Sequence, residues 1–265
     1  MKKVSKRQAC ISVALVSIAL LLIGEIFGFS SLLGLEAGSR IALSLDMIIS
    51  RALGGVAFLA MLINLGYKVL DPIKSPFWRS ILISLPAFVI AVNNFPFSTV
   101  ISGEAKIVEG VPMLLLLLLE CMMVGLFEEM AFRGVIFLRI LKKNPDSKLW
   151  QFASIALSSV IFGLLHLVNL IESAPGAVFL QIGYSALIGA MCAVILLKTA
   201  NIWLCVLIHG IYNFAGAVIP RMGEGRVWDT FTVVLTVIVS LAVVAYMIVL
   251  FLKGKTRTTG EIYLN

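Results

Sequence analysis

Residues 112–139 read PMLLLLLLECMMVGLFEEMAFRGVIFLR, and the second half of this apolar stretch holds two adjacent acids, Glu128 and Glu129, and the base Arg133. The stretch is longer than the roughly 20 apolar residues that cross the ~30 Å hydrocarbon core of a bilayer. An ionisable group in hydrocarbon costs roughly 2.5–3.5 kcal/mol on insertion scales. This membrane helix therefore predicts a buried polar site rather than a plain anchor.

The whole chain has the composition of a membrane protein. Of its residues 60% are hydrophobic and 13% are charged, and the mean hydropathy is +1.06. This leaves too little polar surface for a soluble globule. Apolar runs predict about eight transmembrane helices, at about 9–28, 41–65, 79–98, 112–139, 150–171, 178–198, 201–219 and 229–252. The period-two alternation of a membrane barrel is absent. We therefore expect an all-α polytopic protein, with residues 1–265 in a single transmembrane domain.

Loop charge predicts the orientation, because Lys and Arg stay on the cytoplasmic side. Most of these residues fall in alternate connections, at 2–7, 68–79, 139–148, 198 and 253–257. Both termini are then cytoplasmic, and topology explains the net charge of +7. No basic and aromatic pattern suggests nucleic acid as a partner. The compact chain points to a prokaryotic plasma membrane, with lipid and a peptide or protein substrate as its partners.

The charged motif in residues 127–134 divides into two parts by helical geometry. Glu129 and Arg133 are four apart, so they share a helix face and can pair. Glu128 is rotated from Glu129 by about 100°. One acid can thus neutralise the arginine while the other faces a polar cavity. The alternative is that both acids merely hold Arg133 within the bundle.

The chain has two histidines, and each lies in an apolar stretch with an asparagine soon after it. Phe162 precedes His166 by one turn, and Asn169 follows it by just under one turn, so the three side chains occupy adjoining parts of one face. His209 and Asn213 are four apart and point in the same direction. A lone buried histidine is more often structural than catalytic. Two histidines with amide neighbours and an available glutamate favour a site.

These three patterns, Glu-Glu-x-x-x-Arg, Phe-x-x-x-His and His-x-x-x-Asn, resemble the motif set of the CAAX protease and bacteriocin-processing (CPBP) family of intramembrane endopeptidases. Order, spacing and span count agree, and the motif core covers about residues 112–219. The resemblance implies hydrolysis of a peptide bond within the membrane, as in CAAX-type or leader and bacteriocin processing. A chain with this activity would be a protease of the type II CAAX prenyl endopeptidase kind.

The resemblance also implies roles for single residues. Glu128 would be the general base that activates a water together with His166. His209 and Asn213 would stabilise the oxyanion, an effect that can exceed ~3 kcal/mol per donor. The supporting residues would be Phe162, Asn169 and the pair of Glu129 with Arg133, which holds the helix in place.

The sequence leaves the participation of a metal open. Glu128, His166, His209 and Asn213 can supply nitrogen and oxygen ligands to one divalent cation such as Zn²⁺. A water activated by glutamate and histidine alone uses the same residues. An H-E-x-x-H motif is absent, which excludes the zincin arrangement.

Three other functions compete with a glutamate-dependent or metal-dependent protease. A non-proteolytic immunity or scaffold protein would bind and sequester membrane-active peptides such as bacteriocins, but it would tolerate loss of Glu128. A proton-coupled transporter also uses Glu and His, yet the repeated, broken helices of that class are not evident. Serine hydrolysis is disfavoured because Ser185 lacks the G-x-S-x-G elbow.

Overall fold

A computed structural model describes residues 6–70, 76–171 and 173–253 of the chain, and these residues are almost entirely helical. Six helices are long and apolar enough to cross a membrane. They confirm the all-α polytopic class. Their bounds are α2 (Arg40–Asn64), α5 with its continuation (Val111–Leu141), α7 with its continuation (Lys148–Ile171), α8 (Pro175–Thr199), α9 (Ile202–Met222) and α10 (Thr230–Lys253).

The first and third expected spans correspond to α1 (Lys6–Phe27) and α3 (Phe77–Asn93). Both are apolar, but the apolar stretch of α1 covers only Ile11–Gly24, and α3 as a whole is shorter than the six long helices. Six of the eight expected spans are thus found by length and composition, and the count of eight stays a prediction.

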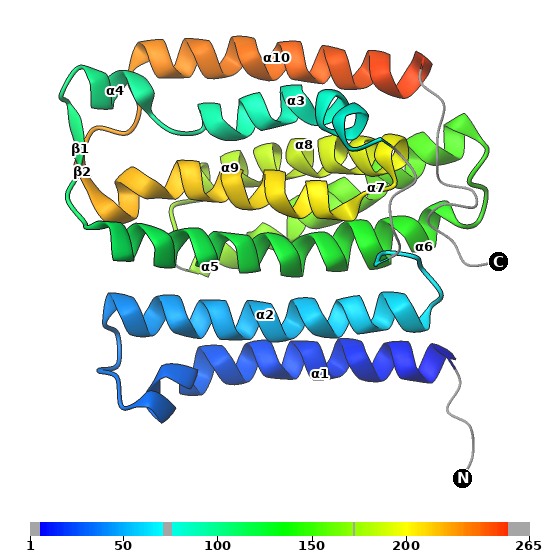
Figure 1. Cartoon of the computed structure of the whole chain (residues 1–265), viewed down its shortest axis with the longest axis horizontal. Helices are drawn as coiled ribbons and strands as arrows, with labels where there is room; N and C mark the ends of the chain where they lie inside the picture. Colours follow the sequence, from blue (N-terminus) through cyan, green and yellow to red (C-terminus); the bar gives the residue numbers. More distant parts are fainter. Residues whose placement is uncertain (1–5, 71–75, 172, 254–265) are drawn as a thin grey trace.

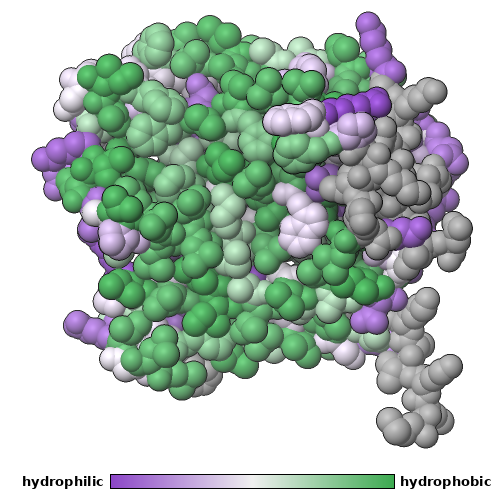
Figure 2. All heavy atoms as spheres, viewed as in Figure 1, coloured by the Kyte–Doolittle hydropathy of each residue, from purple (hydrophilic) through white to green (hydrophobic). Residues whose placement is uncertain are grey.

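The long helices lie nearly parallel in one bundle (Figure 1). The order of contacts across it is α1, α2, α5, α9, α3 and α10, and α7 and α8 pack against one another. The start of α1 and the end of α10 lie at the same end of the bundle (Figure 1). Figure 2 shows apolar side chains over the middle of the visible face and hydrophilic ones gathered towards its two ends, as a bilayer requires.

Local signals in the sequence set several helix ends. Ser39, Ser147 and Asn201 each accept a hydrogen bond from a backbone N–H in the first turn of α2, α7 and α9. Such side chains satisfy donors that the helix itself leaves free. Proline lies in the first turn of α5 and of α8, where it costs no hydrogen bond.

The expected helix at 112–139 is not a regular α-helix throughout. It consists of α5 (Val111–Glu129), a π-helical segment η2 (Met130–Phe137) and a short α6 (Leu138–Leu141). The π segment begins directly after the two glutamates. Such wide turns are rare and occur frequently at functional sites. Similarly, α7 (Lys148–Leu165) ends at His166, where a 3₁₀ segment η3 (His166–Ile171) begins.

A small antiparallel sheet, which the sequence did not indicate, closes one end of the bundle. Strand β1 (Ala105–Ile107) pairs with β2 (Gly223–Gly225), in the register Lys106 with Glu224. The remaining short elements are η1 (Phe29–Leu33) and α4 (Phe97–Ile101). The sheet joins the segment that precedes α5 to the segment that follows α9. It thereby ties together the two helices that carry Glu128, Glu129 and His209.

Candidate active site

His209 on α9 lies between the two glutamates at the end of α5. Its Nδ1 is 2.7 Å from Glu129 Oε1, and its Nε2 is 3.2 Å from Glu128 Oε2. The side chain of Glu129 is fully buried, whereas that of Glu128 is 20% exposed. A single imidazole therefore connects a buried carboxylate to one that remains accessible.

Two glycines allow α5 and α9 to approach closely enough for these contacts. A Cβ on Gly125 would lie 2.9 Å from the Val206 carbonyl oxygen, and a Cβ on Gly210 would lie 2.6 Å from the Met122 sulfur. Both distances are shorter than a carbon atom tolerates. Small residues in membrane helices serve this purpose generally, because they let backbones meet.

Arg133 is the largest fully buried side chain of the site, at 1% exposure. Its Nη1 is 3.0 Å from Glu129 Oε1, which confirms the pairing predicted from their spacing. Its guanidinium lies over the ring of Phe162, 4.4 Å from the centroid, an arrangement that favours a cation. A Cβ on Gly189 of α8 would lie 2.6 Å from Arg133 Nη2. Only glycine leaves room for the guanidinium at that position.

Phe162 lies between the two histidines. Its ring meets the imidazole of His166 edge to face at 5.2 Å between centroids, and that of His209 at 5.8 Å. His166 is half-buried, and its Nδ1 is 3.1 Å from the Phe162 carbonyl oxygen. If Nδ1 carries the proton and donates to that carbonyl, Nε2 of His166 is the free nitrogen. No hydrogen bond or ion pair joins His166 to Glu128 within the described residues.

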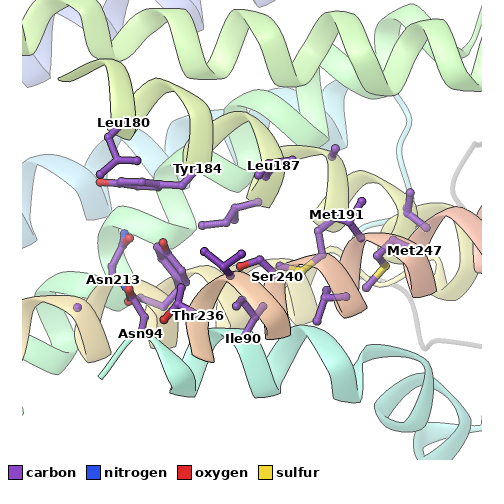
Figure 3. Close-up of a pocket in the computed structure, with 18 of the residues that line it drawn as sticks. Ile90, Asn94, Leu180, Tyr184, Leu187, Met191, Asn213, Thr236, Ser240 and Met247 are labelled. Carbon is purple, nitrogen blue, oxygen red and sulfur yellow. Dashed lines mark hydrogen bonds between the residues drawn. The ribbon is translucent and has the colours of Figure 1, made fainter. Parts of the chain in front are cut away.

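Asn169 and Asn213 make no hydrogen bond with either glutamate among the described residues. Asn169 donates a hydrogen bond to Gln181 on α8 at 2.8 Å, and thus fixes η3 to that helix. Asn213, one turn after His209, lines a cavity of about 1200 Å³ together with Tyr184 and Tyr212. Figure 3 shows Asn213 and Tyr184 approaching one another from α9 and α8. The cavity begins beside the candidate site, and neither histidine lines it.

Residues 110–215, which contain every one of these side chains, match the family model described as type II CAAX prenyl endopeptidase Rce1-like. This segment is Rce1-like. The match confirms the resemblance drawn from the three motifs, covers less than half of the chain, and implies a protease. Neither a curated protein nor a solved structure matches the chain.

The Rce1-like segment does not assemble the metal ligands that the sequence allowed. His209 Nε2 and Glu128 Oε2 are 3.2 Å apart, a separation that two ligands of one cation can have, and Glu129 holds Nδ1 as a carboxylate commonly does for a metal-bound histidine. Asn213 lines the cavity. Within the described residues, the one group of His, Cys, Asp and Glu whose donor atoms converge is Glu129 with Cys192 and Cys205, all within 4.8 Å. Cys205 there donates its S–H to the Cys192 carbonyl oxygen at 3.2 Å, as a packed thiol does. Glu128, His166 and His209 do not form such a group among the described residues, so this geometry does not gather the three titratable ligands within that distance.

Sequence reasoning missed the second partner of Glu129. It assigned this acid to Arg133 alone, whereas the carboxylate also holds His209. It also missed the stacking of Arg133 on Phe162 and the tyrosines at the mouth of the cavity. The aromatic residue of the Phe-x-x-x-His motif could have indicated this stacking, because a buried arginine commonly lies against an aromatic ring. The partner of Glu129 depends on how α5 meets α9, which spacing within one helix does not reveal.

Proposed function

We propose that the protein is an intramembrane endopeptidase that cleaves a membrane-associated peptide or protein by means of an activated water. The observation that carries the proposal is the placement of His209 between Glu128 and Glu129, with Phe162 and His166 alongside, inside the Rce1-like segment. CAAX-type processing and leader or bacteriocin processing are both reactions of this class.

Glu128 is the general base in this proposal, assisted by His166. It is the only one of the two glutamates with an exposed surface, so a water can reach it. The carboxylate takes a proton from the water, the hydroxide attacks the peptide carbonyl carbon, and the protonated acid then gives its proton to the leaving amine. General acid–base catalysis of this type contributes about 10²- to 10⁴-fold to a rate.

His209 and Asn213 are the proposed oxyanion donors. Glu129 accepts the Nδ1–H of His209, which leaves Nε2 directed towards the reacting water and carbonyl. Protonated at Nε2, the imidazole becomes a cation that the fully buried Glu129 stabilises. In the resting site Nε2 contacts Glu128 instead, so that substrate binding exchanges one partner for the other.

The membrane topology is part of the proposal. We infer that α1 and α3 also cross the bilayer, giving eight spans in a single domain, and that both termini lie in the cytoplasm of a prokaryotic cell. The start of α1 and the end of α10 lie at one end of the bundle (Figure 1). In the described chain, the connection from α6 to α7 supplies Lys142 and Lys143, Lys148 begins α7, and Lys253 ends α10. This distribution agrees with the positive-inside rule.

Purified protein in liposomes tests the proposal with a pool of fluorogenic peptides, some of them farnesylated. We expect Glu128→Gln to reduce cleavage by at least about 100-fold, because the amide cannot accept the proton of water. Glu224→Gln is the matched control, since Glu224 lies exposed in β2 and pairs with Lys106 rather than with a residue of the site. Cleavage by the native protein should persist in phenanthroline, because the expected ligands do not converge on a cation.

Two results would contradict this function. Full activity of Glu128→Gln would remove the general base. Tight peptide binding without cleavage by the native protein would favour the sequestering function, of the bacteriocin-immunity kind, that the sequence left as its main alternative. Loss of activity in phenanthroline that added Zn²⁺ restores would overturn only the metal-free mechanism.

A further inference from the structure

The cavity beside Asn213 extends through the thickness of the protein. On α10 its lining residues run from Val233 to Leu252, and this part of a helix is about 28 Å long at ~1.5 Å per residue. That length equals the ~30 Å hydrocarbon core of a bilayer. Its volume of about 1200 Å³ exceeds the roughly 300–1,000 Å³ of sites that take small molecules. The occupant that matches these dimensions spans the membrane.

The cavity is open along its length. Several of its apolar lining residues keep more than half of their surface exposed: Leu180 (69%), Leu187 (54%), Val237 (53%) and Ile248 (53%). These side chains come from α8 and α10, which face one another across the cavity in Figure 3. A membrane-embedded molecule can therefore enter from the side, between these two helices.

Helix α10 is attached on its other side. Asn93 and the Ile83 carbonyl of α3 hydrogen-bond to Thr236 and Tyr246 of α10, at 3.0 and 3.1 Å. Of the six long apolar helices α10 is the least buried, with 11% of its apolar window inside the protein against 56% for α8. The helix is thus held by α3 along this side, and it meets α8 at its C-terminal end, where Lys198 donates a hydrogen bond to the Phe251 carbonyl at 3.3 Å.

A band of polar groups crosses the cavity at one level. Figure 3 shows Asn94, Tyr184 and Asn213 there, and Tyr212, next to Asn213 in the chain, also lines the cavity. Over the described residues, no hydrogen bond involves the Asn213 amide or the two tyrosine hydroxyls, and only the Asn94 amide is engaged, with the Tyr212 carbonyl at 2.9 Å. A hydrocarbon chain has no hydrogen-bond donor or acceptor to pair with these groups. A peptide offers backbone N–H and C=O groups, which must find partners in the absence of water.

This polar band adjoins the proposed catalytic residues. Asn213 lines the cavity and follows His209 by one helical turn. An extended stretch of peptide bound at the band would therefore present its carbonyl groups one helical turn from the imidazole of His209.

We propose that the cavity binds an apolar, membrane-spanning peptide segment, which enters between α8 and α10 and unwinds at the level of Asn94, Tyr184, Tyr212 and Asn213. This inference rests on the proposed protease function and specifies its substrate class. The longer apolar part of the segment contacts the residues on the Met191 and Met247 side of the band, its other end lies towards the ion pair of Glu120 with Arg221, and the bond to be cleaved lies at the band itself.

Photocrosslinking in nanodiscs tests the binding separately from the chemistry. The probe is a synthetic Leu/Ala helix of about 22 residues, long enough to span the bilayer, with benzophenone at its centre. With Glu128→Gln as the background, we expect crosslinks on α8 and α10, mapped by mass spectrometry. Ser240→Trp fills the cavity from α10 and should reduce them by at least about tenfold. Leu241→Trp is the matched control, because the adjacent Leu241 is 65% exposed and does not line the cavity.

The possible outcomes separate the two proposals. Crosslinks on α1 or α2, or equal labelling in both tryptophan variants, would overturn the peptide site. Labelling of α8 and α10 by a photoactive phospholipid or farnesyl probe, but not by the helix, would assign the cavity to a lipid chain. Crosslinking at the expected place in a protein that cleaves no peptide would leave this site standing and overturn the catalytic function.

Discussion

Glu129 is the residue on which the site depends structurally. Its carboxylate contacts a buried arginine and a buried imidazole at once, through the same oxygen. The net charge of the three groups is zero when the imidazole is neutral, which is the condition under which such groups tolerate burial. Glu128 differs, because its side chain is partly exposed and its one ion pair among the described residues is with His209. Adjacent residues of the same type therefore have separable roles, one in stability and one in catalysis.

The two glutamates should consequently respond differently to truncation. Glu129→Ala leaves Arg133 buried without its ion pair, and we expect a loss of about 3–5 kcal/mol in the free energy of unfolding. Glu128→Ala should abolish cleavage while the stability changes by less than about 1 kcal/mol, because the site there is open to water. Denaturation in mixed micelles measures both variants. Equal destabilisation by the two substitutions would refute this division.

At the scale of the elements, the approach of α8 to η2 sets the position of the guanidinium. Gly189 faces Arg133 directly, whereas Gly183 on the same helix has open space where a side chain would begin. Both glycines belong to one small-residue pattern in the sequence, and periodicity does not distinguish them. The difference arises because only one of them lies opposite the arginine of another helix.

The two glycines provide a matched pair of substitutions. Gly189→Ala places a methyl group 2.6 Å from Arg133 Nη2 and should cost about 1–3 kcal/mol of stability, as overpacking does. Gly183→Ala meets nothing within 4 Å and should be neutral or slightly stabilising, since alanine favours the helix. Thermal unfolding of the two purified variants compares them directly. A similar midpoint for both would show that α8 can shift away from the guanidinium.

The sequence predicted the elements better than their contacts. The apolar runs located the six long helices, and the four-residue spacing placed Glu129 beside Arg133. The π-helical segment that begins at Met130 was not predictable, because its wider turns use ordinary helix-forming residues. The contact of Glu129 with His209 joins helices 80 residues apart, and no single-helix pattern contains that information. The cavity escaped prediction for the same reason, since four or more helices build it.

On the scale of the whole molecule, the candidate active site and the small sheet of β1 and β2 lie towards opposite ends of the bundle. The glutamates lie near the end of α5 that continues into α6 and the lysines of the next connection. The small sheet lies at the other end of α5 and α9 (Figure 1). If the lysine-rich end is cytoplasmic, the proposed active site opens towards the cytoplasmic half of the membrane and the sheet faces outwards.

Labelling of single introduced cysteines tests that orientation. Lys106→Cys lies in the exposed strand β1, and Lys143→Cys lies in the exposed connection before α7. A membrane-impermeant maleimide should modify the first in intact cells and the second only in inverted vesicles. The described native cysteines at 121, 192 and 205 are buried, and the unsubstituted protein gives the background. The reverse pattern would invert the proposed topology.

The pairing of β1 with β2 restricts how α9 can move relative to α5. The backbone N–H groups of Val108 and Glu109 both donate hydrogen bonds to the Met222 carbonyl, at 2.9 and 3.1 Å. The small sheet is therefore continuous with the last turn of α9. Sliding of α9 along α5 would have to break this ladder first. In the proposed orientation, an antibody fragment that binds the strand pair from outside would thus change the spacing of acid and imidazole in the opposite half of the membrane.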